Sequence, residues 1–291
     1  LGATAIGIAG MSPVDDRTMT VYDRWIAGGN HGEMSYMARY RDVRHNPENL
    51  LPGAKSIVTA AFNYYPRELR DERMPRFAYY AYGRDYHEVV RERLERLAGY
   101  IREHCGGETR VCVDTAPIFE HYWARRSGLG FTGVNSLLII PGAGSYVVLG
   151  EIITTATLDT TEPCTGDCGN CGACVRACPT GAIKGDGTID ATCCLSYLTI
   201  EYRGELPDGI PAGNRIYGCD TCQQVCPHNR YAGPTDIEDF SPSAEFLKLD
   251  EEAIAALTPE KFNALFRHSA VKRTKLKGLI RNLELLRKIK S

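Results

Sequence analysis

The apolar positions in the first third of the chain follow two different spacings. Between residues 86 and 104 they recur every three or four positions, which predicts an amphipathic helix with one buried face. Gly106 and Gly107 end this helix. Residues 15–40 show a helical pattern with a glycine-rich interruption, whereas residues 55–62 form a continuous β-branched and apolar run. Such a run is typical of a buried strand.

The pattern around Asp114 predicts a strand followed by a helix. Residues 110–113 form a short apolar strand. The sequence Asp-Thr-Ala-Pro from Asp114 then supplies a side-chain acceptor and an early proline, which predicts a helix to Gly128 with Asp114 as its N-cap. The apolar runs 136–140 and 145–153 are separated by Pro-Gly-Ala-Gly, and we expect them to form a hairpin.

The C-terminal part is expected to be helical at residues 251–257, 259–266 and 276–290, and its charge is divided. Residues 235–260 carry eight acidic side chains and one lysine, whereas residues 267–290 carry nine Lys or Arg and one Glu. A basic segment of this density is either a solvated helix face or a surface that contacts phosphates.

Composition places the chain among ordinary globular proteins. It has 291 residues, of which 43% are hydrophobic and 24% charged, and this length accommodates two domains or one domain with an insertion. No apolar run approaches the roughly 18 residues of a membrane-spanning helix, and the start does not resemble a signal peptide. We therefore expect a cytoplasmic monomer without membrane contact. Because the chain begins with Leu1 rather than Met, N-terminal trimming is one interpretation.

Most of the cysteines lie in two runs that each end in Cys-Pro. The first contains Cys168, Cys171, Cys174 and Cys178, and the second contains Cys219, Cys222 and Cys226. In bacterial two-cluster ferredoxins, three cysteines of a run bind one cluster and the fourth, before proline, binds the other. This rule predicts two 4Fe–4S clusters, with the following ligands: Cys168, Cys171, Cys174 and Cys226 for one, and Cys178, Cys219 and Cys222 for the other. The missing eighth ligand is Cys194 or its neighbour Cys193.

Two other uses of these cysteines are less consistent with the spacing. Paired CxxC motifs also form structural zinc sites. A zinc site, however, explains neither the third cysteine of the first run, Cys174, which again follows two intervening residues, nor the two Cys-Pro endings. A disulfide framework is typical of small secreted proteins. Twelve cysteines in a long chain without a signal peptide indicate metal ligation in a reducing compartment.

Several segments resemble the epoxyqueuosine reductase family, in the same order along the chain. They are residues 113–152, the phrases CGNCGACVRACPTGAI and CLSYLTIEYRG, residues 213–229 and residues 269–282. The resemblance implies an α+β fold: a cobalamin-binding core similar to nitroreductases and reductive dehalogenases, a ferredoxin-like domain, and a short helical C-terminus. We place these parts at residues 1–158, 159–232 and 233–291.

The resemblance also implies cofactors and an activity. Members of the family carry base-off cobalamin and two 4Fe–4S clusters, and reduce epoxyqueuosine at the tRNA wobble position to queuosine. Cob(I)alamin would be the reductant, supplied with electrons by an external donor through the clusters. A reductive dehalogenase, a ferredoxin-type electron carrier and a zinc-dependent RNA-binding module are the alternatives.

Residue roles follow from the same resemblance. Asp114 matches the family's proposed proton donor, which requires a carboxyl buried in an apolar pocket. Cys194 matches the eighth cluster ligand, so that Cys164 and Cys193 become free thiols. Cobalamin contacts fall on Asp114, Leu138, Leu149, Ser196, Gly218, Cys219, Asp220, Thr221 and Cys222. Arg203 resembles a tRNA-contacting position, and the basic C-terminal side chains that we expect on phosphates are Lys272, Arg273, Lys275, Lys277 and Arg281.

Overall fold

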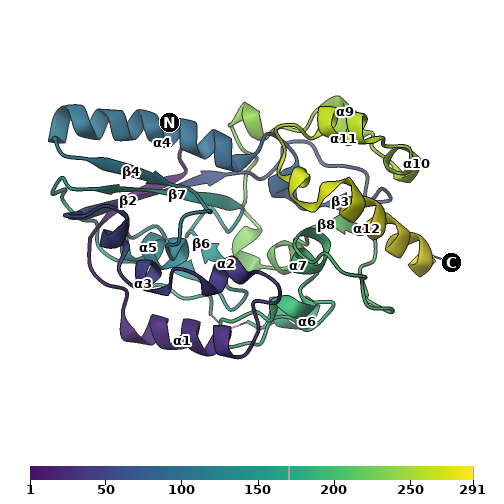
Figure 1. The fold of residues 1–291 in the computed structure, drawn as a ribbon, viewed down its shortest axis with the longest axis horizontal. Coiled ribbons are helices and arrows are strands. Elements are labelled where there is room, and N and C mark those ends of the chain that lie inside the picture. Colours follow the sequence, from purple (N-terminus) through teal and green to yellow (C-terminus); the bar gives the residue numbers. More distant parts are fainter. Residues whose placement is uncertain (170, 291) are drawn as a thin grey trace.

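The computed structural model describes residues 1–169 and 171–290. Its larger lobe is built on a four-stranded antiparallel sheet in the order β1–β2–β7–β4 (Figure 1). The strands are β1 (Ala5–Gly10), β2 (Ser56–Asn63), β7 (Val147–Thr154) and β4 (Thr109–Cys112). β2 is buried along nearly its whole length, which explains its continuous apolar run.

Helices cover both faces of this sheet, as its alternating side chains require. Val58 and Ile152 face helix α4 (Tyr86–Cys105), whose apolar stripe includes Val90 and Leu94. On the opposite face, Ile57 and Ile153 pack with Trp123 and with helices α1 (Asp16–Ala27) and α5 (Glu120–Arg126). The predicted helix at residues 86–104 and the buried strand at residues 55–62 are confirmed.

Two local predictions are wrong. The helix expected from Asp114 begins only at Glu120, with Phe119 as its N-cap residue. The chain from Asp114 to Phe119 is instead a loop, so that Asp114 is not a helix cap. The expected hairpin does not form either: β6 (Leu138–Ile139) pairs with β5 (Phe131–Thr132), while β7 pairs with β2 and β4. Pairing in the central sheet buries both faces of β7. This burial outweighs the pairing of β7 with the neighbouring apolar run 136–140.

The second lobe has its own hydrophobic core. Strand β8 (Arg215–Tyr217) pairs in parallel with β3 (Arg76–Phe77), and helix α7 (Leu195–Ile200) packs beside them. The C-terminal helices belong to this same core through Phe246, Phe262, Leu279 and similar side chains. The predicted boundary at residue 232 therefore separates segments that share a core. These helices are α9 (Ala244–Leu247), α10 (Glu251–Ala255), α11 (Pro259–Leu265) and α12 (Lys275–Lys290).

The cysteine-rich segment contains little regular structure. Its helices α6 (Ala173–Ala177) and α8 (Thr221–Gln224) lie side by side and contact each other. The remaining short elements are α2 (Ser35–Ala38), α3 (Arg41–His45), η1 (Pro47–Leu50), η2 (Tyr79–Ala81), η3 (Ala191–Cys193), η4 (Pro227–Asn229), η5 (Glu238–Phe240) and η6 (Ala270–Thr274).

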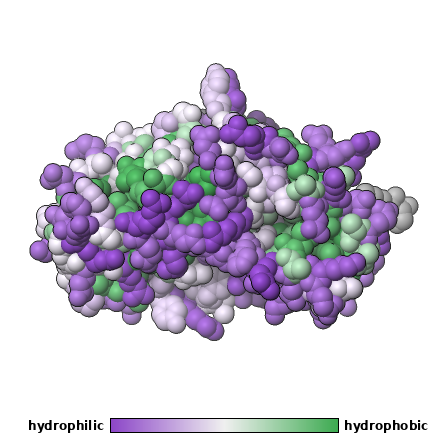
Figure 2. Space-filling model, turned by 90° about the horizontal axis from the view of Figure 1, so that it is seen from above, coloured by the Kyte–Doolittle hydropathy of each residue, from purple (hydrophilic) through white to green (hydrophobic). Residues whose placement is uncertain are grey.

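Hydrophilic side chains cover most of the face seen in Figure 2, with hydrophobic atoms gathered between them in a few areas. Within the part of the chain that the structure describes, no helix combines the length and the apolar character that crossing a membrane requires.

Candidate active site

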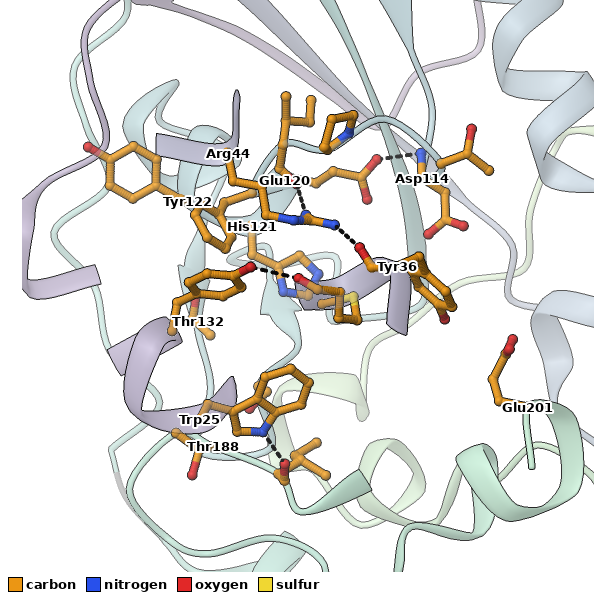
Figure 3. A pocket seen from close by; sticks show the side chains of 18 of the residues that line it. Trp25, Tyr36, Arg44, Asp114, Glu120, His121, Tyr122, Thr132, Thr188 and Glu201 are labelled. Carbon is orange, nitrogen blue, oxygen red and sulfur yellow. Dashed lines mark hydrogen bonds between the residues drawn. The ribbon is translucent and has the colours of Figure 1, made fainter. Parts of the chain in front are cut away.

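A cavity of about 1420 Å³ lies where the two lobes meet. Ordinary small-molecule pockets measure roughly 300–1,000 Å³, so this one accommodates a ligand of unusual size or two ligands together. Its wall combines the loop after β4, the segment around α2, the loop 186–189 and η6. Figure 3 shows Asp114 and Glu120 on one side of it, with Glu201 across from them. Tyr217, two residues before Cys219, also lines the cavity.

Asp114 lies in the loop after β4, directly after Val113. Its φ of 50° lies in the left-handed region, which is unfavourable for a residue with a side chain. Its backbone N–H donates to Glu120 Oε1 at 2.7 Å, and this bond helps to hold the strained turn. Half of the Asp114 side chain is exposed, so that the protein alone does not provide the apolar burial expected for a proton donor.

His87 connects Asp114 to a second carboxylate. Its Nε2 lies 2.9 Å from Asp114 Oδ2, and its Nδ1 lies 2.7 Å from Asp85 Oδ1. Tyr86 stacks on the ring, with centroids 4.1 Å apart. Burial alone would lower the pKa of His87, but the hydrogen bonds with Asp114 and Asp85 outweigh it and raise this pKa to about 9. The imidazole is therefore protonated at neutral pH and donates to both carboxylates.

Two further carboxyl groups, those of Glu120 and Glu151, lie near the Asp114–His87 pair. Burial, reinforced by the Asp114 carboxylate, raises the pKa of Glu120 to about 8. Glu151 lies in the middle of β7 and is fully buried. Neither of its carboxyl oxygens has a hydrogen-bond partner among the described residues, and burial together with Glu120 raises its pKa well above the usual range. Both carboxyls are thus held in the protonated form near neutral pH.

At the rim of the cavity, Arg273 forms a bidentate ion pair with Glu201, at 2.8 and 2.7 Å. Its guanidinium also lies over the Tyr36 ring, 5.7 Å from the centroid. This contact links the segment around α2 to the end of η6 across the opening.

The first set of cysteines surrounds one small cavity. Cys168, Cys171, Cys174 and Cys226 all line it, together with Asn135 and His228. Each cysteine of a cubane binds a different iron, so that the thiols stand apart around the cluster. Accordingly, the donor set fits a 4Fe–4S cluster. Among residues 1–169 and 171–290, no three His, Cys, Asp or Glu side chains are arranged to hold a single metal ion.

The second set gathers around Cys194. Burial raises the pKa of the Cys194 thiol to about 11, and Cys219 and Cys178 are close enough to add to this effect. Burial also raises the pKa of Cys222, with Cys219 and Cys194 as the next contributors. By contrast, the Cys193 thiol points to the Asp190 carbonyl, 3.6 Å away. This arrangement favours Cys194 over Cys193 as the eighth ligand.

Comparison with known proteins identifies the family. The family model described as "Epoxyqueuosine reductase QueG, DUF1730" matches residues 44–115, and "4Fe-4S double cluster binding domain" matches residues 167–229. An epoxyqueuosine reductase of Cyclobacterium marinum is 41% identical over 99% of this chain and 93% of its own length. The Escherichia coli (strain K12) enzyme of the same name is 40% identical over 89% and 71%. This chain belongs to the epoxyqueuosine reductase family.

Solved structures of epoxyqueuosine reductases share the fold of nearly all of this chain. One, in complex with an epoxyqueuosine-modified tRNA-Tyr stem loop, has a TM-score of 0.86 at 34% identity and covers 98% of this chain and 77% of that chain. Another, from Bacillus subtilis with its catalytic loop swung out of the active site, has a TM-score of 0.85 at 33% identity, with the same coverage. The family resemblance and fold class inferred from sequence are therefore confirmed.

Only some of the residues predicted to contact cobalamin or tRNA line the cavity of this epoxyqueuosine reductase family member. Asp114, Lys272 and Arg273 line it. Leu138 and Leu149 are instead buried in a hydrophobic cluster beside the sheet. Ser196 and the segment 218–222 are not part of the cavity wall, although their neighbours Ile200 and Tyr217 are. These cobalamin contacts stay predictions.

All three arginines predicted to contact tRNA have structural partners, Arg273 through its ion pair with Glu201. The Arg281 guanidinium donates to the carbonyls of Leu198, Tyr202 and Gly204 at 2.8 Å. Arg203 donates to the carbonyls of Ile200 and Arg273, also at 2.8 Å. Lys275 and Lys277 are exposed, which leaves them accessible to a phosphate.

Four residues of the site do not stand out in the sequence pattern: His87, Asp85, Glu120 and Glu151. His87 and Glu120 lie in α4 and α5, and Asp85 is the N-cap of α4, so that helix formation and capping account for their positions without any function. The available signal was the sequence Asp-Tyr-His at the start of α4. Its Asp85 and His87 are polar, and α4 packs against β4, which brings them near the loop that follows this strand.

Proposed function

We propose that this protein reduces epoxyqueuosine in tRNA to queuosine, with a cobalamin in the large cavity and two 4Fe–4S clusters. The observation that carries the proposal is the Asp114–His87 pair on the wall of this cavity, in a chain of this family. The relative solved with an epoxyqueuosine-modified tRNA stem loop supports the substrate. A tRNA substrate is consistent with the cytoplasmic location that we expect.

The size of the cavity supports cobalamin as a second ligand beside the nucleoside. With a volume of about 1420 Å³, the cavity exceeds what a nucleoside alone requires. We propose that Asp114 contacts the cofactor from the cavity wall. The backbone contacts expected near Leu138, Leu149, Ser196 and residues 218–222 lie outside this wall, so they require the cofactor to extend beyond it. When bound, cobalamin supplies a strongly reducing, nucleophilic metal centre. We propose Cys168, Cys171, Cys174 and Cys226 as the ligands of one cluster, and Cys178, Cys194, Cys219 and Cys222 as the ligands of the other.

The residues of this chain would position the substrate and move protons. Opening an epoxide leaves negative charge on its oxygen, and a positioned acid neutralises it. Asp114 is that acid in our proposal. Glu120 holds its backbone and His87 its side chain, so that the carboxyl stays directed at the cavity. Cofactor and substrate would together cover the half of its side chain that the protein leaves exposed.

The wobble nucleotide has to leave its loop to reach Asp114, as unstacked RNA bases commonly do on proteins. Lys272 and Arg273 at the cavity wall, with Lys275 and Lys277 outside it, form a basic surface on this path. We propose that this surface contacts the tRNA backbone.

Anaerobic reconstitution with iron, sulfide and cobalamin tests the whole proposal. Metal analysis should find about eight irons and one cobalt per chain, as two cubanes and one corrin require. Epoxyqueuosine-containing tRNA should then be converted to queuosine-containing tRNA, detected by mass spectrometry of the nucleosides. Eight irons without cobalt and without conversion would instead indicate an electron carrier.

A further inference from the structure

The stoichiometry of the proposed reaction requires more protons than one carboxyl holds. Conversion of an epoxide to an alkene breaks two C–O bonds, forms a C=C bond and releases the oxygen as water. It consumes two electrons and two protons. The electrons come from an external low-potential donor through the clusters. The protons must pass through groups at the cavity. A single carboxyl such as Asp114 transfers one proton and must then be reprotonated before it can transfer the second.

We propose that His87 is the proton reserve of Asp114, supplying the proton that Asp114 passes to the substrate at each of the two transfers. The Nε2 proton of the imidazolium moves to Oδ2 of the Asp114 carboxylate, and from this carboxyl to the oxygen as the first C–O bond breaks. His87 then regains a proton from solvent, and a second proton follows the same route to the oxygen as it leaves as water. A final proton from solvent restores the imidazolium. This inference rests on the proposed function.

The geometry fits a relay. The 2.9 Å contact joins His87 Nε2 to the Asp114 carboxylate itself, within the range for direct proton transfer. On the other side of the ring, the 2.7 Å contact with Asp85 Oδ1 fixes the orientation of the imidazole and stabilises its positive charge. About a third of the His87 side chain is exposed, which gives solvent access for reprotonation. His87 acts through Asp114 and is therefore a positioning residue.

The charges around His87 favour its protonated form. Asp85 precedes it at the start of α4, and Asp114 faces it from the loop after β4. Glu120 on α5 is held mainly in its neutral form near neutral pH, and Tyr86 covers one face of the ring. Lys272 on η6 also acts on Asp85 and is the opposing positive charge. The two direct carboxylate contacts outweigh this single cation.

The protonation state is measured without the reaction. Diethyl pyrocarbonate acylates only a neutral imidazole, and peptide mass spectrometry assigns the rate to each histidine. In cluster-reconstituted protein without cobalamin, acylation of His87 should rise with a midpoint near pH 9. Asp85→Asn should move this midpoint to lower pH. A midpoint at the ordinary histidine value of about 6.5 would overturn the inference.

Single-turnover conversion with prereduced holoenzyme tests the transfer. His87→Gln keeps a side-chain donor near Asp114 but has no proton to give, and conversion should slow about 10²-fold. Wild-type conversion should decline above about pH 9, and this decline should be absent in the variant. His268→Gln is the matched control, since His268 contacts Glu88 on the same helix at 3.1 Å and does not contact Asp114. It should behave as wild type.

The outcomes separate this inference from the proposed function. Conversion by the wild type together with an unimpaired His87→Gln variant that keeps the alkaline decline would overturn only the role of His87. Absence of conversion by fully loaded wild type would overturn the proposed function, and the proton reserve with it.

Discussion

Asp114 shows how a single loop residue is prepared for chemistry by its neighbours. An oxygen of the Glu120 carboxyl group accepts its backbone N–H, and the His87 ring contacts its side chain. Both neighbours come from helices that pack on the sheet for reasons unrelated to catalysis. The positive φ of Asp114 is thus maintained by contacts to rigid elements.

Replacing Asp114 by Asn should remove the acid and leave the fold intact. We expect Asp114→Asn to retain iron and cobalt at wild-type levels and to slow conversion about 10²-fold or more. Metal analysis and single-turnover conversion measure the two effects. Asp42→Asn, at a side chain that is 94% exposed, serves as the control. Unchanged conversion by Asp114→Asn would remove this residue from the mechanism.

Glu151 makes stability depend on pH in a defined direction. Because burial raises its pKa in the folded state, the folded protein keeps a proton that the unfolded chain releases above pH ~4.3. The free energy of unfolding contributed by this group therefore decreases as pH rises from this value toward the folded pKa.

The amide of Gln is neutral at every pH, so that Glu151→Gln should be more stable than wild type at pH 8 and similar to it at pH 4–5. One pKa unit corresponds to about 1.4 kcal/mol, and we expect a gain in Tm of at least about 2 °C at pH 8. Anaerobic thermal unfolding between pH 5 and 8 measures it. The exposed Glu95→Gln should show no such gain, and an equal pH dependence in wild type and Glu151→Gln would contradict the prediction.

At the level of elements, the C-terminal helix α12 separates two kinds of basic residue. Arg281 turns inward and satisfies three carbonyls around the end of α7, whereas Lys275 and Lys277 are exposed. A basic face inferred from sequence therefore contains one arginine whose main contribution is to packing between α7 and α12.

Loss of the Arg281 guanidinium should destabilise the second lobe. Arg281→Met leaves partly buried carbonyls without a donor, which costs about 1–3 kcal/mol. We expect a lower Tm, and tRNA affinity close to wild type at temperatures where the variant is folded. Thermal unfolding and filter binding measure the two quantities. A large loss of affinity without loss of stability would indicate a direct contact with tRNA.

Lys277 should show the opposite behaviour. Lys277→Glu should leave Tm within about 2 °C of wild type and weaken tRNA binding. If one phosphate contact is lost, the slope of log K against log salt should become shallower by about 0.7–0.9. Binding titrations at several salt concentrations measure this slope. Arg96→Glu on α4 matches the change in charge outside the cavity wall, and an equal effect of both variants would indicate general electrostatics.

On the scale of the whole molecule, the two lobes are stabilised in different ways. The sheet lobe has three packed hydrophobic clusters, and the second lobe has one large core that includes the C-terminal helices. Residues 164–190 contribute little to these hydrophobic clusters. Their one described helix is α6, and it has no buried residue. Metal ligation should therefore account for most of the order in this segment.

Removal of iron by a chelator under reducing conditions tests this difference. Limited proteolysis should then cleave first within residues 164–190, while peptides from β2 and β7 stay protected. Mass spectrometry of early fragments identifies the sites, and holoprotein digested in parallel is the control. Early cleavage in the sheet lobe would show that the clusters stabilise the whole molecule.

The sequence by itself determined the features that depend on local spacing. The periodicity of α4 and the apolar run of β2 follow from burial of one or both faces, and the two Cys-Pro runs follow from ligand geometry. A family resemblance added the role proposed for Asp114. Only the tertiary structure decided that Asp114 begins a loop, that β7 joins the central sheet, and that Arg281 faces inward. It also brought His87 to Asp114, because contacts between residues far apart in the chain depend on how elements pack and leave no local pattern.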